Sequence, residues 1–192
     1  MPNVIFSPDG HVAIHVARDD WWVEIGKLRM PAGTKNFSLE TWREFGWAPD
    51  SKTFYLTHSE GASTGYSVDV YRLDQGRISR LPHIDRLVRK DFNRHHSCWE
   101  RTPRGWVGND PNVAGVLWVK DSTELLLVAE VPPIGICEDS EYFGGYSISI
   151  TSGEIVARYS PRELMTRWGK ILGERLTGNF EELSEEQRTK AP

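Results

Sequence analysis

The residues best suited to chemistry lie in two short stretches of the chain. Residues 61–65 read Gly-Ala-Ser-Thr-Gly, which matches the G-x-S-x-G pattern of a nucleophile elbow. An elbow needs a helix after the serine, but alternating residues predict a strand there, so we interpret 61–65 as a hairpin loop. Residues 95–98 read His-His-Ser-Cys. Adjacent histidines point in different directions and no second ligand pair completes a zinc site, so we predict no catalytic residues, no metal site and no cofactor.

The two cysteines, Cys98 and Cys137, lie in polar, loop-like stretches, where buried structural thiols are uncommon. A disulfide between them would contribute about 3–4 kcal/mol through loop entropy and would need an oxidising compartment. Two free thiols are the alternative.

The start of the chain bears on localisation. It lacks the basic and apolar regions of a signal peptide, and strand-like sequence begins at about the third residue. We therefore expect a periplasmic or secreted protein whose leader is absent from this sequence, with a cytoplasmic location as the alternative.

Composition limits the class of protein. A chain of 192 residues is long enough for one domain with a sizeable core. No apolar run is long enough for a membrane span. The net charge of −4 and the lack of a groove-entering motif argue against nucleic acid as a partner. Eight tryptophans are unusual for this length and suit both sheet cores and recognition surfaces.

One sequence pattern occurs twice and loosely a third time. Residues 6–10 read Phe-Ser-Pro-Asp-Gly and residues 47–51 read Trp-Ala-Pro-Asp-Ser, each between two apolar runs. Pro followed by Asp and a small residue is typical of a tight turn, so each copy predicts a strand–turn–strand hairpin. Residues 116–131 repeat the pattern with Lys-Asp-Ser at the turn. Two further strands follow the second and third copies, which makes units of four short antiparallel strands.

These residues resemble the WD40-like, TolB-type repeat, in which an apolar strand, Ser/Ala-Pro-Asp-Gly/Ser and a second apolar strand recur. The resemblance covers residues 3–82 and 113–159 and implies blades of a β-propeller, without implying an activity. We therefore predict an all-β fold: a small or incomplete propeller-like array of about three four-stranded units, at 3–40, 41–82 and 113–159, in a single domain spanning 1–180.

Three blades are fewer than the four to eight of closed propellers. A weak fourth blade is hidden or missing, or a second chain completes the ring as a homodimer, or helices of the same chain cover the open side. Of the last two we favour the helices. A helix is predicted at 161–176, because Ser160, Pro161 and Glu163 form a capping box ahead of an apolar stripe. A helical insertion is expected at 83–112, and residues 181–192 are expected to be a flexible acidic tail.

For function we favour a non-catalytic protein-binding module, such as an inhibitor or immunity-type protein of a bacterial envelope. The alternatives are a hydrolase or lyase with a site at the axial end of the blades, and a subunit that completes a larger propeller by homodimerisation. Residues 83–104 carry more basic than acidic side chains, which would suit an acidic protein partner. The candidate partner-binding residues are Trp21, Trp22, Arg89, Arg94, His95, His96 and Trp99.

Overall fold

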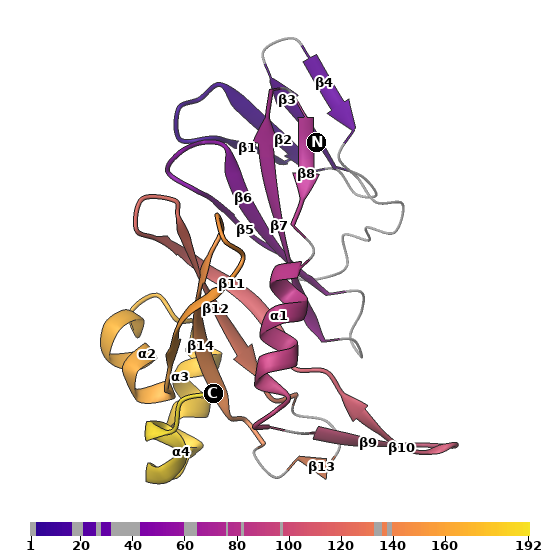
Figure 1. Cartoon of the computed structure of the whole chain (residues 1–192), viewed down its shortest axis with the longest axis vertical. Coiled ribbons are helices and arrows are strands. Elements are labelled where there is room, and N and C mark those ends of the chain that lie inside the picture. The colour runs from indigo at the N-terminus through magenta and orange to yellow at the C-terminus, as the bar shows by residue number, and fades with distance from the viewer. Residues whose placement is uncertain are drawn as a thin grey trace.

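The computed structural model describes residues 3–16, 21–25, 28–31, 43–59, 65–75, 77–81, 83–96, 98–132, 136–137 and 140–192. These residues form four antiparallel sheets and four short helices, so the predicted predominance of sheet is confirmed (Figure 1). The strands described form no closed ring of sheets.

Three of the sheets have four strands each, and their strands lie side by side in chain order. The first sheet contains β1 (Asn3–Phe6), β2 (Val12–Val16), β3 (Trp21–Ile25) and β4 (Leu28–Pro31). The second contains β5 (Arg43–Trp47), β6 (Thr53–Ser59), β7 (Tyr66–Asp74) and β8 (Arg77–Arg80). The third contains β11 (Asn112–Val119), β12 (Glu124–Glu130), β14 (Phe143–Ser149) and β15 (Ile155–Tyr159). Each of these sheets coincides closely with one of the repeat units read from the sequence.

The repeated turns are hydrogen-bonded to one another. In each turn the residue after the aspartate has a positive φ: 72° at Gly10, 58° at Ser51 and 75° at Ser122. The backbone amide of Asp9 donates to the hydroxyl of Ser51 (3.1 Å), and that of Asp50 donates to the hydroxyl of Ser122 (2.9 Å). The serine hydroxyl of each later turn therefore accepts a hydrogen bond from the turn before it, and these bonds align the three sheets.

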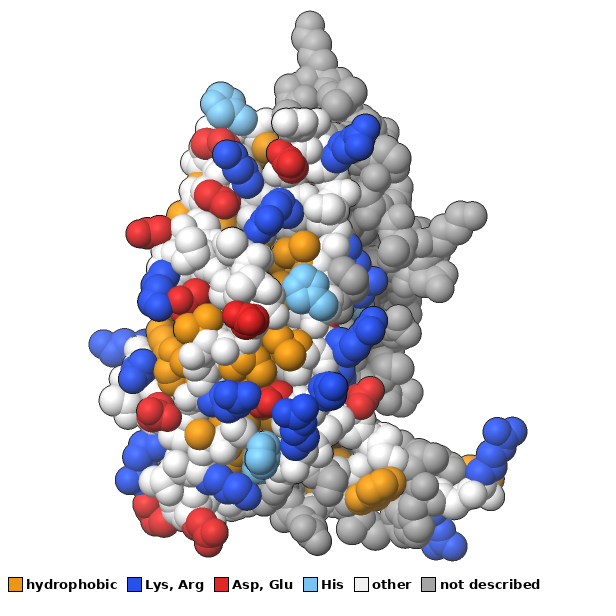
Figure 2. Space-filling model, viewed as in Figure 1, with side chains coloured by type: hydrophobic (Ala, Val, Ile, Leu, Met, Phe, Trp, Pro, Cys, Tyr) orange, Lys and Arg blue, Asp and Glu red, His pale blue; other side chains and the backbone are white. Residues whose placement is uncertain are grey.

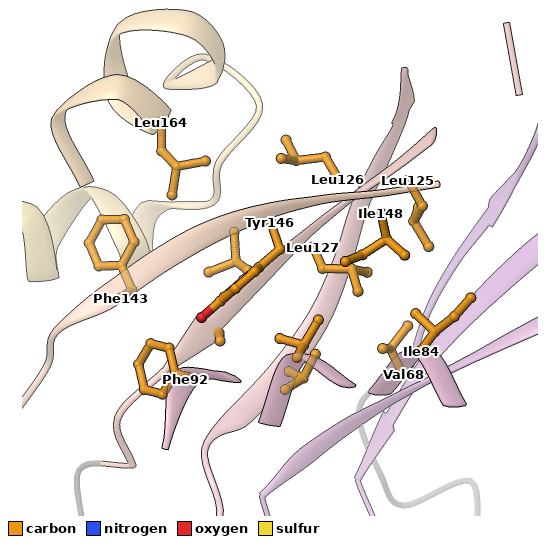
Figure 3. Packing of buried hydrophobic residues seen from close by; sticks show 14 of the residues in the cluster. Val68, Ile84, Phe92, Leu125, Leu126, Leu127, Phe143, Tyr146, Ile148 and Leu164 are labelled. Carbon is orange, nitrogen blue, oxygen red and sulfur yellow. The ribbon is translucent and has the colours of Figure 1, made fainter. Parts of the chain in front are cut away.

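The third sheet forms the centre of the core. Helix α1 (His83–Phe92) packs on one of its faces through Ile84 and Phe92, and Leu164 of helix α2 (Pro161–Trp168) packs on the other (Figure 3). A Cβ at Gly145 would overlap the Leu164 side chain, so glycine at this position lets α2 approach the sheet closely. Strands β12 and β14 are consequently buried on both faces. Between its terminal glutamates β12 reads as a continuous apolar run, whereas β14 contains two glycines and two serines.

The C-terminal region differs from the prediction. The capping box at Ser160 and Glu163 is present, but the helix ends at Trp168 and not at 176. Two more helices follow, α3 (Glu174–Glu182) and α4 (Glu185–Thr189). The stretch expected to be a flexible tail thus contains a helix, which Ser184 begins with a second capping box. Leu183, which is 4% exposed, anchors this stretch in the core.

The predicted helical insertion at 83–112 is helical only in its first third. After α1 the chain forms strands β9 (Cys98–Thr102) and β10 (Gly105–Asn109), joined by a turn at Pro103 and Arg104. Gly105 has a φ of 121°, which glycine adopts far more readily than other residues. The tight Pro-Arg-Gly turn therefore favours a hairpin over a continued helix.

No helix in the described part of the chain is long and apolar enough to cross a membrane.

Candidate functional site

A small three-stranded sheet projects from the body of the molecule below α1 (Figure 1). It consists of the β9–β10 hairpin and β13 (Ile136–Cys137), which pairs with β9. Cys98 and Cys137 are direct partners in this pairing and form a disulfide, with their Cα atoms 4.4 Å apart. The predicted disulfide is therefore confirmed. Because a hairpin alone is marginally stable in water, this bond is well placed to hold it.

The hairpin exposes side chains typical of binding surfaces. Trp99 is 49% exposed, and Gly108 faces it across the hairpin. Arg101, two residues further along β9, is exposed, as is Arg104 at the turn. Tryptophan and arginine are the residue types most enriched among the energetically dominant contacts of protein interfaces. A tryptophan left half exposed on a projecting element has no evident role in the core.

Arg89, one of the candidate binding residues, lies against the protein's own backbone. Its guanidinium donates to the carboxylate of Asp85, to the carbonyl oxygens of Tyr66 (2.7 Å) and Pro111, and to the hydroxyl of Ser67 (2.9 Å). These bonds fasten α1 to the start of β7 and to the segment before β11. The structure therefore assigns Arg89 a structural role, and its part in partner binding stays a prediction.

The other candidates fall in different environments. His96 is 2% exposed and stacks on the ring of Tyr142, with 3.9 Å between ring centroids. Arg94 is 61% exposed and lies 3.6 Å from Asp91, and its neighbour His95 is exposed. The stretch leading into the hairpin thus presents Arg94 and His95 outwards and buries His96.

The two remaining candidates, Trp21 and Trp22, lie in β3, but their side chains are outside what the structure describes. Most of the G-x-S-x-G stretch likewise lies outside the described residues.

A cavity of about 700 Å³ lies between the second and third sheets. Its walls come from β5 and β6, from β11 and β12, and from residues 171–176, which lead from the segment after α2 into the first turn of α3. Three glutamates reach it from different elements: Glu44 on β5, Glu130 on β12 and Glu174 at the start of α3. The lining residues within the described chain include no Lys, Arg or His. This volume is typical of small-molecule sites.

Tyr55 forms the wall of the cavity where the two sheets meet. Its ring lies between Gly46 and Gly115, at either of which a Cβ would overlap it. Its hydroxyl donates to the carbonyl oxygen of Val116 (2.9 Å). Burial, together with the nearby carboxylate of Glu44, raises the pKa of this hydroxyl to about 12. The hydroxyl therefore stays protonated at neutral pH.

Glu130 is fixed deep in the same cavity. It is 4% exposed, and its two oxygens accept from the side-chain amides of Asn112 (3.4 Å) and Asn179 (2.7 Å). Asn112 in turn accepts from the backbone amide of Tyr66 (3.0 Å). The carboxylate thus has a defined position between the third sheet and α3.

Sequence reasoning missed this cavity. Its lining residues are spread over the chain and form no motif. The only local signal is glycine inside the strand-like stretches around Gly46 and Gly115, which indicates close approach of another group.

A second ionic cluster lies in the second sheet. Asp69 accepts from the hydroxyl of Tyr71 (3.1 Å) and from Nε of Arg80 (2.8 Å), and it lies 3.4 Å from Nε2 of His58. Burial alone would raise the pKa of Asp69, but the bonds from His58 and Arg80 outweigh burial and lower it. These side chains bond to one another across β6, β7 and β8, which is typical of a structural network.

The described residues contain no group of three or more His, Cys, Asp or Glu side chains arranged to hold a metal ion. No protein-family model matches the chain, and no curated protein matches it either.

Proposed function

We propose that this protein is a non-catalytic protein-binding module, in which the β9–β10 hairpin engages a partner protein. The observation that carries the proposal is the half-exposed Trp99 on a projecting hairpin whose base is closed by the Cys98–Cys137 disulfide. A rigid element loses little conformational entropy on binding, and an exposed indole can then bury a large apolar area.

The surroundings of the hairpin extend this surface. Lys and Arg side chains gather on the face that contains α1, and further basic side chains lie on the projecting hairpin (Figure 2). Arg94, Arg101 and Arg104 are all exposed. Such a surface complements an acidic partner, because opposite charges steer association and suppress wrong partners. We therefore infer a partner with an acidic patch around an apolar pocket for Trp99.

The scaffold and the compartment belong to the same proposal. The sheets of the repeat units, aligned through their turns, support an incomplete propeller-like array of the WD40-like type. Helices α2 and α3 pack against the third sheet and α4 packs on α2, which favours coverage of the open side by the chain's own helices over ring closure by a second copy. The disulfide supports an oxidising location such as the periplasm, where an inhibitor or immunity-type protein would act.

Comparative capture from periplasmic and secreted extracts of the source organism tests the proposal. The bait variant Trp99→Ala/Arg101→Ala removes the exposed hairpin side chains. The control variant Phe6→Ala/Arg77→Ala removes a still more exposed aromatic side chain from the first sheet and an exposed arginine from the second.

A partner should be captured by wild type and control but reduced about tenfold or more with the hairpin variant, since dominant interface residues cost at least 1–2 kcal/mol. Equal capture by all three baits, or no specific capture by wild type, would overturn the proposal. Thermal unfolding of each bait checks that the variants are folded.

A further inference from the structure

We propose that the peptide bond between Arg104 and Gly105 is a processing site for a trypsin-like serine endopeptidase, and that the cut protein persists as two disulfide-linked chains. This proposal does not rest on partner binding by the hairpin. It follows from an exposed arginine at a turn, from a projecting element that can open locally, and from a disulfide that joins the two sides of the bond.

The turn of the β9–β10 hairpin presents the residue type that such an enzyme recognises. Pro103, Arg104 and Gly105 are all exposed, at the end of the sheet that projects from the body (Figure 1). A specificity pocket with an aspartate at its base accepts an arginine side chain and directs cleavage to the bond that follows it. Exposed tips of loops are also the places where proteolytic cleavage concentrates.

The hairpin can open at its turn without unfolding the body. A protease must draw the residues on both sides of the bond into an extended conformation, so the strand pairs nearest the turn must separate. Among the described strands, β10 is the outer strand of its sheet and pairs with β9 alone. The pairs from Gly105–Thr102 to Val107–Glu100 lie between the turn and the disulfide-bonded Cys98. A small exposed sheet opens at lower cost than a buried core.

Two other exposed basic residues at described turns are less suitable. Lys52 and Lys120 belong to the repeated turns, which align the sheets. The carbonyl oxygen of Lys52 accepts from the backbone amide of Leu73 on β7 (2.7 Å), and that of Lys120 accepts from the amide of Thr123 (3.1 Å). Opening either turn would disturb the packing of the sheets, whereas opening the hairpin tip leaves the sheets in place.

The position of the bond explains why the cut protein would stay together. Residues 1–104 contain the first two sheets and α1, and residues 105–192 contain the third sheet and the remaining helices. Cys98 lies before the bond and Cys137 after it, so the disulfide joins the two products covalently. Helix α1 also keeps its place in the hydrophobic core formed with the third sheet. Both a covalent bond and apolar burial therefore hold the two chains in one fold.

Cleavage would change the surface of the hairpin. Hydrolysis adds water across the amide: the bond from the carbonyl carbon of Arg104 to the nitrogen of Gly105 breaks, the hydroxyl goes to the carbon and the proton to the nitrogen. The products are a carboxylate on Arg104 and an ammonium group on Gly105. Strand β10 is then tethered only where it leads into β11. Because Gly108 on β10 lies opposite Trp99, release of β10 alters the surroundings of the exposed indole.

Limited digestion of the native protein with trypsin at neutral pH tests the proposal, with the products weighed by mass spectrometry before and after reduction. The variant Arg104→Gln removes the recognised side chain. The matched control Arg101→Gln removes another exposed arginine of the same hairpin, away from its turn. The variant Leu164→Ala leaves a cavity in the core and raises the population of the globally unfolded state.

We expect an early cut after Arg104 whose products, 1–104 and 105–192, separate only on reduction. The rate of this cut should fall at least about tenfold in Arg104→Gln and stay within about twofold in Arg101→Gln. It should also stay within about twofold in Leu164→Ala, whereas cleavage through global unfolding would rise about a hundredfold.

Four results would overturn the proposal: digestion that leaves the Arg104–Gly105 bond intact, equal cleavage of it in Arg104→Gln, products that separate without reduction, or a large rise in Leu164→Ala. Partner capture has no part in this experiment, so its outcome is separate from that of the proposed function.

Discussion

The third sheet and the small sheet of the hairpin are held by different forces. Strands β12 and β14 are covered by α1 on one face and by α2 on the other, and almost every side chain along them is buried. The hairpin projects from the body, leaves Trp99 half exposed and is joined to β13 by a disulfide. One region is stabilised by apolar burial and the other by a covalent bond at its base.

This difference bears on where the proposed binding residues can lie. A sheet that is buried on both faces tolerates few changes, because each substitution leaves a cavity or a clash. A surface sheet anchored at its base can change its outward residues at little cost in stability. Binding residues are therefore expected on the second kind of region, where they can be exposed without weakening the core.

Removing the disulfide should have the largest effect. In Cys98→Ala/Cys137→Ala we expect the free energy of unfolding in urea to fall by about 3–4 kcal/mol, because the bond closes a separation of 39 residues in the unfolded chain. Amide hydrogen exchange should show early loss of protection at 98–109, with β12 and β14 still protected. Thiol titration of the native wild type is the control, and two reactive thiols there would contradict the bond.

A cavity in the core beside the third sheet should lower the free energy of unfolding slightly less than removal of the disulfide. Leu164→Ala is expected to lower the free energy of unfolding by about 3 kcal/mol, since Leu164 is fully buried on Gly145 and its removal leaves a cavity. The control Val156→Ala, at a side chain that is 50% exposed on β15, should cost under about 0.5 kcal/mol. Hydrogen exchange at 98–109 should change no more than global stability requires. A selective loss of protection at 98–109 would contradict the conclusion that the hairpin and the third sheet are stabilised separately.

Much of the fold was predictable because its signals are local. The repeated Asp-Gly and Asp-Ser turns, the apolar strands around them and the capping box at Ser160 all act within a few residues. The hydrogen bonds between the turns could not be predicted from the sequence. Ser51 and Ser122 accept from Asp9 and Asp50, which lie far from them in sequence.

The site was less predictable. The cysteine pair was predicted from residue type and context, but nothing in the sequence indicated that Arg89 would bond to Tyr66, Ser67 and Pro111. The errors had local causes too. The helical insertion expected at 83–112 did not allow for the turn of the β9–β10 hairpin after α1, and the acidic character of the last residues hid the buried Leu183. Tertiary burial outweighed local composition there.

The smallest expected loss of stability comes from breaking an ion pair between α1, the helix that precedes the hairpin, and the third sheet. Asp91 on α1 is buried and accepts two hydrogen bonds from Arg158 on β15 (2.7 and 2.8 Å), with Arg94 nearby. Since Arg158 is 41% exposed, solvent screens the pair, and we expect Asp91→Asn to cost roughly 1–2 kcal/mol at pH 7.

The pH dependence of this cost tests its electrostatic origin. Hydrogen bonding from Arg158 lowers the pKa of Asp91 below its ordinary value of 3.8. A lowered folded-state pKa means that the contribution is complete well above pH 3.8 and is lost as the pH falls through the folded-state value. The difference in unfolding free energy between wild type and Asp91→Asn should therefore be constant from about pH 6 to 8 and shrink below about pH 4. A difference that persists unchanged at about pH 2–3 would mean that packing, and not the charge of Asp91, joins α1 to the third sheet.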